Sequence, residues 1–99
     1  MDKETIINLF RKIITSLLCI EKTTNNNQLK KESLEYLYNF INYYKIIIET
    51  NDINNIKIDC NEEDIIDFSY RCIEDRETDL VRFAEDVQFS IIEIKKIIK

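Results

Sequence analysis

The sequence predicts an all-α protein: a compact bundle of about four helices with one long connection near residues 50–60. The 99-residue chain contains no glycine and no proline, and the tight turns of β-hairpins generally require glycine. Apolar residues recur at intervals of three and four in four separate segments, which is the period of an amphipathic helix. Hydrophobic residues make up 44% of the chain and charged residues 33%, which is typical of a soluble globular domain. The length suits a single domain over residues 1–99.

The first helix is expected from about Lys3 to Ile20, with Asp2 as its N-cap and Glu4 favourable in its first turn. The asparagine- and threonine-rich stretch 23–27 ends it, because these side chains compete for backbone hydrogen bonds and favour turns. One apolar stripe is predicted to face the core, and it consists of Ile6, Phe10, Ile13, Ile14, Leu17 and Leu18.

The second helix is expected over about Leu29 to Glu49 and is followed by the long connection. Its predicted inner stripe is Leu34, Leu37, Ile41, Tyr44 and Ile48, widened by Phe40 and Ile47. The apolar residues of the stretch 50–60 do not follow a helical period, and Ile56 and Ile58 alternate with polar residues. This stretch is interpreted as a connection with a short extended piece, whose isoleucines tuck under the bundle.

The third helix is predicted to begin after Asn61, a capping residue that precedes three acids in the first turn. Its predicted inner face is Ile65, Ile66, Ser69 and Ile73. A boundary near residues 75–78, with Asp75 or Thr78 as N-cap, separates it from a fourth helix, although one long bent helix over 62–99 remains an alternative. The most regular apolar seam of the chain follows, and it is predicted to pack within the bundle or across a dimer. The seam consists of Leu80, Ala84, Val87, Ile91, Ile94 and Ile98.

The composition argues against most catalytic and metal chemistry. Without glycine, the phosphate-binding loops of nucleotide enzymes and the EF-hand loop are absent in their standard form. Without histidine, a zinc site or an activated catalytic thiol lacks its usual partner. Acid pairs such as Asp64 with Asp67, or Glu74 with Asp75, are interpreted as solvated charges. We therefore expect no enzymatic activity, no metal and no cofactor.

The thiols and the N-terminus predict a cytoplasmic protein. The chain contains an odd number of cysteines at wide spacing, Cys19, Cys60 and Cys72. They are interpreted as buried or half-buried small hydrophobic residues in a reducing compartment. The first residues are too acidic for a secretory leader, and charged and hydroxyl residues interrupt the apolar stretch behind them. No membrane span is therefore expected.

Negative charge is concentrated in one part of the chain. Residues 59–86 contain eleven acids and three arginines, a net charge of −8, so the remainder carries +3 of the total −5. This distribution argues against direct binding of nucleic acid, because phosphate binding needs a basic surface. It favours a basic protein partner, since a surface of one sign speeds encounter with the opposite sign.

Six residues of this segment are candidates for partner binding: Glu63, Asp67, Tyr70, Glu74, Asp79 and Asp86. The first four recur at spacings of four, three and four, so they share the outer face of the third helix. A tyrosine between carboxylates is typical of an interface anchor with a charged rim. The fourth helix is expected to repeat the pattern on its outer side with Asp79, Asp86 and Phe89. The alternative is that the acids are merely solvated and the tyrosine packs on a neighbouring helix.

A second aromatic pair, Tyr36 and Tyr43, is more simply explained by packing inside the bundle.

A small, acidic, single-domain helical protein with such a face resembles the immunity proteins that bacteria carry against bacteriocin, colicin and contact-dependent-inhibition toxins. The residues that carry the resemblance are the six candidates above. It implies a non-enzymatic toxin inhibitor, or antitoxin, that covers a basic nuclease-type toxin domain with its acidic surface. Two alternatives remain open: a viral host-interference protein similar to the poxviral Bcl-2-like bundles, and a homodimeric structural or regulatory module assembled through the seam of the fourth helix.

Overall fold

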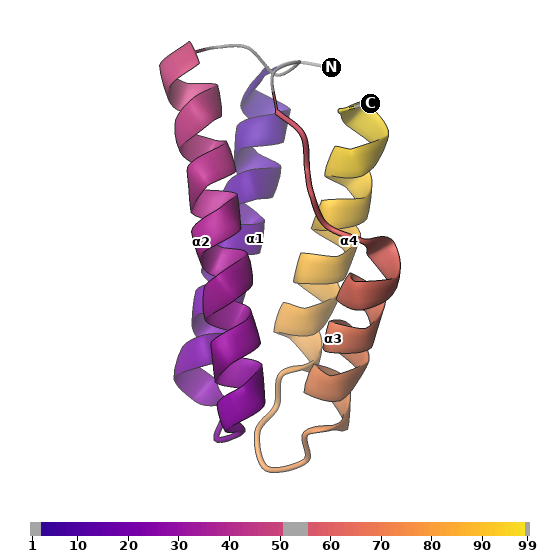
Figure 1. Ribbon diagram of the computed structural model, residues 1–99. Helices are drawn as coiled ribbons and strands as arrows, with labels where there is room; N and C mark the ends of the chain where they lie inside the picture. Colours follow the sequence, from indigo (N-terminus) through magenta and orange to yellow (C-terminus); the bar gives the residue numbers. More distant parts are fainter. Residues whose placement is uncertain (1–2, 51–55, 99) are drawn as a thin grey trace.

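The computed structural model describes residues 3–50 and 56–98, and every regular element in these ranges is an α-helix. Its helices are α1 (Lys3–Thr23), α2 (Asn27–Thr50), α3 (Glu62–Glu74) and α4 (Val81–Ile97) (Figure 1). The predicted all-α bundle with a long connection before its third helix is confirmed. The expected cap Asp2 and the residues 51–55 of the connection lie outside the described ranges.

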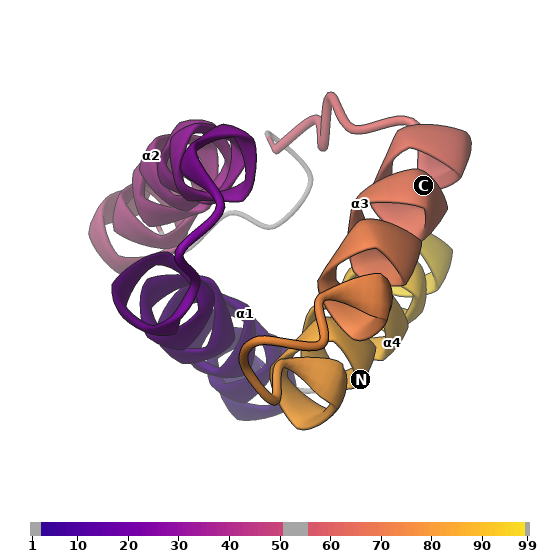
Figure 2. The same cartoon turned by 90° about the horizontal axis from the view of Figure 1, so that it is seen from below.

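The helices are arranged in the order α2, α1, α4, α3 around one core (Figure 2). α1 packs against both α2 and α4, and α3 packs chiefly against α4. α2 and α3, at the two ends of this arc, touch each other through only a few residues. α3 therefore has one closely packed helical neighbour, which leaves a wide part of its circumference facing outwards.

Aromatic rings fill the core between the helices. Phe10, Phe40 and Phe68, from three different helices, are fully buried. The ring centroids of Phe10 and Phe40 lie 6.0 Å apart, and Tyr43 meets Phe40 edge-on at 5.4 Å. Tyr36 of α2 contacts the ring of Phe68 of α3 at 5.3 Å, which helps to close the α2–α3 side of the arc. The prediction that Tyr36 and Tyr43 pack inside the bundle is confirmed.

The apolar stripes of the first two helices are narrower than predicted. In α1, Ile14 is half-buried and Leu18 is exposed, and both lie beside the fully buried stripe of this helix. In α2 the predicted residues Leu34 and Ile48 are exposed, and the buried stripe is instead Leu29, Ser33, Leu37, Phe40 and Ile47. Two apolar stripes run along the sequence of α2, and only one is buried because α2 has a single closely packed neighbour, α1.

The turn between α1 and α2 is held by its own polar side chains. Asn26 Oδ1 accepts hydrogen bonds from the backbone N–H groups of Gln28 (2.9 Å) and Leu29 (3.1 Å), as an N-cap does. Because Asn26 caps the helix, α2 begins two residues before the position that its apolar pattern predicted. The expected end of the first helix in the stretch 23–27 is confirmed.

Asp75 joins this turn to the turn between α3 and α4. Its Oδ2 accepts hydrogen bonds from the hydroxyls of Thr24 (3.2 Å) and Thr78 (3.0 Å), and its Oδ1 accepts one from the backbone N–H of Glu77 (3.2 Å). Thr24 is itself buried, with 1% of its surface exposed. The carboxylate of Asp75 therefore connects two turns that lie far apart in the sequence but at the same end of the molecule (Figure 1).

Residues 75–80 separate α3 from α4, so the alternative of one long bent helix over 62–99 is wrong. The expectation that Asp75 or Thr78 caps α4 is also wrong, because Asp75 is the C-cap of α3 and Leu80 is the N-cap of α4. Leu80 makes no side-chain cap and is fully buried, so burial of an apolar side chain fixes the start of this helix. Its seam, up to Ile94, is buried inside the single chain and is not available for a dimer.

The described part of the long connection, residues 56–61, contains no helix and runs past α4 to the start of α3 (Figure 1). Ile56 is buried and Ile58 is half-buried, whereas Lys57 between them is exposed, so the predicted alternation is confirmed. Side chains of two helices bind its backbone: Tyr43 Oη accepts the N–H of Asp59 (3.1 Å) and Lys95 Nζ donates to the carbonyl of Cys60. These bonds supply partners that backbone outside a helix would otherwise lack.

Candidate functional site

α3 carries most of the candidate site, and its first turn begins as predicted. Asn61 is the N-cap, and its side-chain oxygen accepts a hydrogen bond from the backbone N–H of Glu63 at 2.8 Å. The three acids that follow lie at the positive end of the helix dipole, where negative charge is favourable. The whole helix contains five acids and one arginine, which gives it a net charge of −4.

Four of the six candidate residues share one exposed stripe, which we call the acidic face: Glu63, Asp67, Tyr70 and Glu74. At 100° per residue, these four positions lie within about 60° of one another around the helix axis. They are diametrically opposite the buried residues of the same helix, which are Ile65, Phe68, Ser69 and Cys72. Tyr70 is 60% exposed, so the alternative in which it packs on a neighbouring helix is wrong.

The inner face of α3 differs from its prediction in one respect that matters for the site. Ile65 and Ser69 are buried as expected, but Ile73 is 37% exposed and Ile66 is half-buried. Apolar residues cover more than half of the circumference of α3, and the sequence alone does not show which of them the neighbouring helix covers. Because Ile73 lies three residues after Tyr70, it adds exposed apolar surface beside the ring.

Arg71 reduces the negative charge at one edge of the acidic face. Its Nε donates to Asp67 Oδ2 at 3.0 Å, and its Nη1 donates to Glu32 Oε2 of α2. The hydrogen bond that Arg71 donates to Glu32 is the largest cause of a raised pKa of Arg71, followed by a smaller opposing effect of burial. Among the residues described, neither Glu63 nor Glu74 forms an ion pair, so no cation in this part of the chain offsets these two acids.

Asp79 and Asp86 do not belong to the acidic face, and their expected place on the outer side of the fourth helix is wrong. Asp79 is exposed in the turn before α4, which begins only at Val81. The half-buried Asp86 faces α1, and its Oδ1 lies 3.6 Å from Lys12 Nζ. Phe89 is on the outer side of α4 as expected, with 61% of its surface exposed. The sequence did not reveal the contact of Asp86 because it depends on how α1 and α4 pack.

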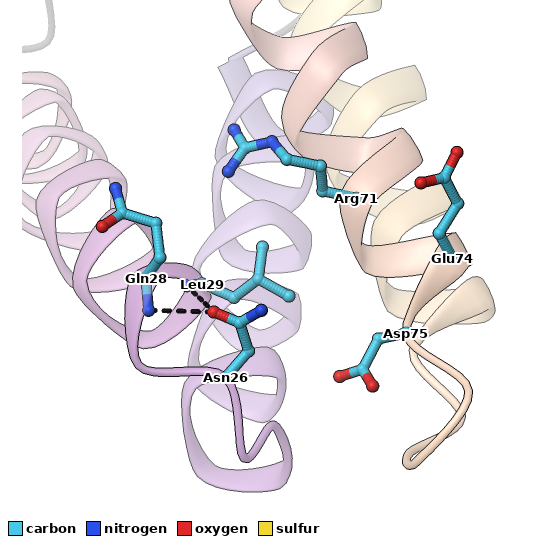
Figure 3. A pocket seen from close by; sticks show the side chains of 6 residues that line it. All are labelled: Asn26, Gln28, Leu29, Arg71, Glu74 and Asp75. Atoms are coloured by element: carbon cyan, nitrogen blue, oxygen red, sulfur yellow. Dashed lines mark hydrogen bonds between the residues drawn. The ribbon is translucent and has the colours of Figure 1, made fainter.

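A hollow of about 330 Å³ lies between the end of α3 and the start of α2 (Figure 3). Its lining residues are Asn26, Gln28, Leu29, Arg71, Glu74 and Asp75. Figure 3 shows Arg71 reaching towards α2, whereas Glu74 points away from it. Arg71 and Asp75 already have partners in the protein, and the carboxylate of Glu74 is directed outwards, away from α2 (Figure 3).

Two thiols and one phenol that are buried or half-buried have raised pKa values. Burial is the largest cause that raises the pKa of Cys60 to about 11 and the pKa of Cys72 to about 12. Burial likewise raises the pKa of Tyr36 to about 12. A protonated thiol is a poor nucleophile, so neither of these cysteines is prepared for covalent chemistry. Within residues 3–50 and 56–98, no group of three or more Cys, Asp or Glu side chains is placed to hold a metal ion.

Comparison of the chain with protein-family models, with curated proteins and with solved structures finds no match. None of the helices within the described ranges is long and apolar enough to cross a membrane.

Proposed function

We propose that this protein is a non-enzymatic inhibitor that binds a basic protein partner through the acidic face of α3. The observation that carries the proposal is the stripe of Glu63, Asp67, Tyr70 and Glu74, exposed along its whole length on the side of the helix opposite the core. Tyr70 is the anchor, Ile73 extends its apolar surface, and the carboxylates form the rim. Asp79 and Asp86 are not part of the contact.

The ring of Tyr70 and the carboxylates of the acidic face are expected to contribute to binding in different ways. Tyrosine supplies a large contact area with little rotamer freedom to lose, and such residues dominate the binding energy of many interfaces. Exposed carboxylates contribute less to affinity but accelerate encounter with a positively charged surface, in a way that salt weakens. Glu63 and Glu74 serve this purpose best, since neither is neutralised by a cation in the described part of the chain.

The partner that fits this surface is a domain with a basic substrate-binding site, such as a nuclease that must bind phosphates. The resemblance to immunity proteins points to a nuclease-type toxin as that domain. Covering its basic site with carboxylates would exclude the nucleic acid, because both ligands require the same positive surface. The protein would thus neutralise the toxin without any reaction of its own, in the cytoplasm where the toxin acts.

The first experiment identifies the partner. A photo-crosslinking amino acid is placed at position 70 and, in a matched variant, at position 38, where Tyr38 of α2 is 67% exposed but lies on another helix. The proposal predicts that one basic protein is crosslinked from position 70 and not from position 38. In the genome that encodes this chain, we expect the gene of the crosslinked protein immediately beside the gene of this chain.

Function is then tested directly with the identified partner. Co-expression with this chain should rescue growth and suppress the partner's nuclease activity, and Tyr70→Ala should lose at least about tenfold in inhibition. Tyr38→Ala, which removes an equally exposed ring, should inhibit as the wild type does. A partner that is acidic, or a loss of inhibition that is equal for the two variants, would refute the acidic face as the inhibitory surface.

A further inference from the structure

A second hollow lies between α1 and α4, away from the acidic face, and its charge is of the opposite sign. Its volume is about 350 Å³, and it is lined by Arg11, Lys12, Thr15, Ser16, Arg82, Phe83 and Asp86. Three cations and one carboxylate give the lining a net charge of +2. A basic hollow of this size is unexpected in a chain whose net charge is −5, and no part of the proposed inhibition uses it.

The cationic side chains that line this hollow have hydrogen-bond donors that no group in the described residues uses. Arg11 is held by Tyr44, whose hydroxyl accepts from Nε at 3.1 Å and whose ring centroid lies 5.9 Å from the guanidinium carbon. Its terminal nitrogens make no hydrogen bond within the described residues. Arg82 makes neither an ion pair nor a side-chain hydrogen bond in the same part of the chain. Lys12 has Asp86 as its partner at 3.6 Å, a long contact at a 55% exposed side chain.

Ser16 provides an independent observation. Only 4% of this residue is exposed, yet its hydroxyl has no hydrogen-bond partner among the described residues. The buried Ser33 and Ser69, in contrast, donate to the backbone carbonyls of Leu29 and Ala84. No fully enclosed side-chain oxygen in the described part lacks a partner, so the Ser16 hydroxyl opens into the hollow that it lines. Ser90 also lacks a partner but does not line this hollow.

We infer that the α1–α4 hollow is a binding site for a small phosphate monoester, with the phosphate between Arg11, Lys12 and Arg82 and the organic body against Phe83. A phosphate monoester carries a charge of about −1.5 to −2 at neutral pH, which matches the lining, whereas a carboxylate carries only −1. Its three terminal oxygens use donors from arginine, lysine and the Ser16 hydroxyl together. The half-buried ring of Phe83 offers an apolar wall that inorganic phosphate would leave uncovered.

The test is a titration of the full chain followed by two-dimensional NMR, with phenyl phosphate, inorganic phosphate and acetate as probes at one ionic strength. We expect saturable shifts for phenyl phosphate at the amides of Arg11–Ser16 and Arg82–Asp86, with weaker binding of inorganic phosphate and weaker still of acetate. Shifts that do not saturate, or acetate binding as tight as phenyl phosphate, would overturn the inference. Equal affinity for inorganic and phenyl phosphate would also overturn it, because Phe83 would then take no part.

Charge variants separate a built site from general attraction of anions. Arg82→Glu should weaken phenyl phosphate binding at least about tenfold, whereas Arg76→Glu makes the same charge change in the α3–α4 turn, outside the hollow, and should have little effect. Asp86→Asn should tighten binding several-fold, because it removes the only lining carboxylate and releases Lys12. Equal effects of the two arginine variants would show non-specific attraction and contradict the site.

The variant Ser16→Ala distinguishes a role of this hydroxyl in ligand binding from a role in the stability of the fold. Because the Ser16 hydroxyl has no partner in the described part of the chain, this variant should unfold at the wild-type temperature or slightly above it, yet bind phenyl phosphate several-fold more weakly. Wild-type affinity for phenyl phosphate in this variant would show that Ser16 does not contact the ligand. The hollow would then be no more than a basic surface patch, and the inference would be overturned. This site is independent of the acidic face, so Tyr70→Ala should leave phenyl phosphate binding unchanged.

Discussion

Single polar side chains determine where the helices of this protein end. Asn26 and Asn61 cap α2 and α3, and both are recognisable in the sequence because asparagine precedes a helical pattern. Asp75 was also recognised as a boundary residue, but its role could not be read from its neighbours. It binds Thr24, which is 51 positions away in the sequence, and only the packing of the helices brings the two together.

Asp75→Ala should lower the free energy of unfolding by about 1–3 kcal/mol. The variant loses three hydrogen bonds and leaves the buried hydroxyl of Thr24 without its acceptor. Urea unfolding followed by circular dichroism measures the change. Glu77→Ala removes an exposed carboxylate from the same turn and serves as the control, with an expected change within about 0.5 kcal/mol. A cost for Asp75→Ala as small as that of the control would contradict its connecting role.

At the scale of elements, the sequence predicted the existence of all four helices but, for α2 and α3, not which stripe is buried. The period of α4 was unambiguous, and its seam from Leu80 to Ile94 is buried as predicted. α2 and α3 carry apolar residues on more than one stripe, and the choice between them depends on the neighbouring helix. The acidic stripe was predictable for the opposite reason: polar positions that recur with a helical period must lie on one face, whichever side packs.

The cap of α3 connects fold stability to the candidate site. Asn61→Ala should cost about 1 kcal/mol and loosen the first turn of α3, which carries Glu63. Hydrogen exchange at the amides of Glu63 and Ile65, which donate to the side chain and the carbonyl of Asn61, should accelerate, whereas exchange in α2 should change only by the global loss of stability. Asn61→Asp keeps an acceptor at the cap and should behave as the wild type. Equal protection of the first turn in the alanine variant would show that the cap does not hold it.

The whole molecule should lose stability in alkali. The pKa values of Cys60 and Cys72 are raised from 9.0 to about 11 and about 12, and that of Tyr36 from 10.0 to about 12. Above pH 9 the unfolded chain therefore releases these protons before the folded chain does, which favours unfolding. The stabilisation is complete below about pH 9 and is lost as the pH rises towards 12. Each group contributes a slope of at most about 1.4 kcal/mol per pH unit within its own window, and the half-buried Cys60 and Tyr36 contribute less than the fully buried Cys72 because solvent screens them.

Urea titrations between about pH 7 and pH 11 measure this slope. Cys72→Ala removes one of the three groups, so its stability curve should fall less steeply above pH 9 by about one proton, whatever its stability at neutral pH. Parallel curves for the variant and the wild type would show that burial of Cys72 does not disfavour its thiolate.

The distribution of charge over the whole molecule is less one-sided than the sequence suggested. The segment 59–86 carries −8, a count that already includes Arg71, but Lys12 of α1, from outside the segment, lies against Asp86. What remains is a narrower surface on α3, at whose two ends Glu63 and Glu74 are unpaired within the described residues. Neutralisation by cations from distant parts of the chain depends on tertiary packing, which a count of charges along the sequence does not contain.

The most direct test of the acidic face is the dissociation constant of the complex with the crosslinked partner, measured for Glu63→Lys/Glu74→Lys between about 50 and 500 mM salt. Both side chains are exposed and unpaired in the described ranges, so the double variant should fold as the wild type does. We predict at least about tenfold weaker binding at low salt and a shallower salt dependence than that of the wild type. An unchanged dissociation constant with an unchanged salt dependence would contradict the account.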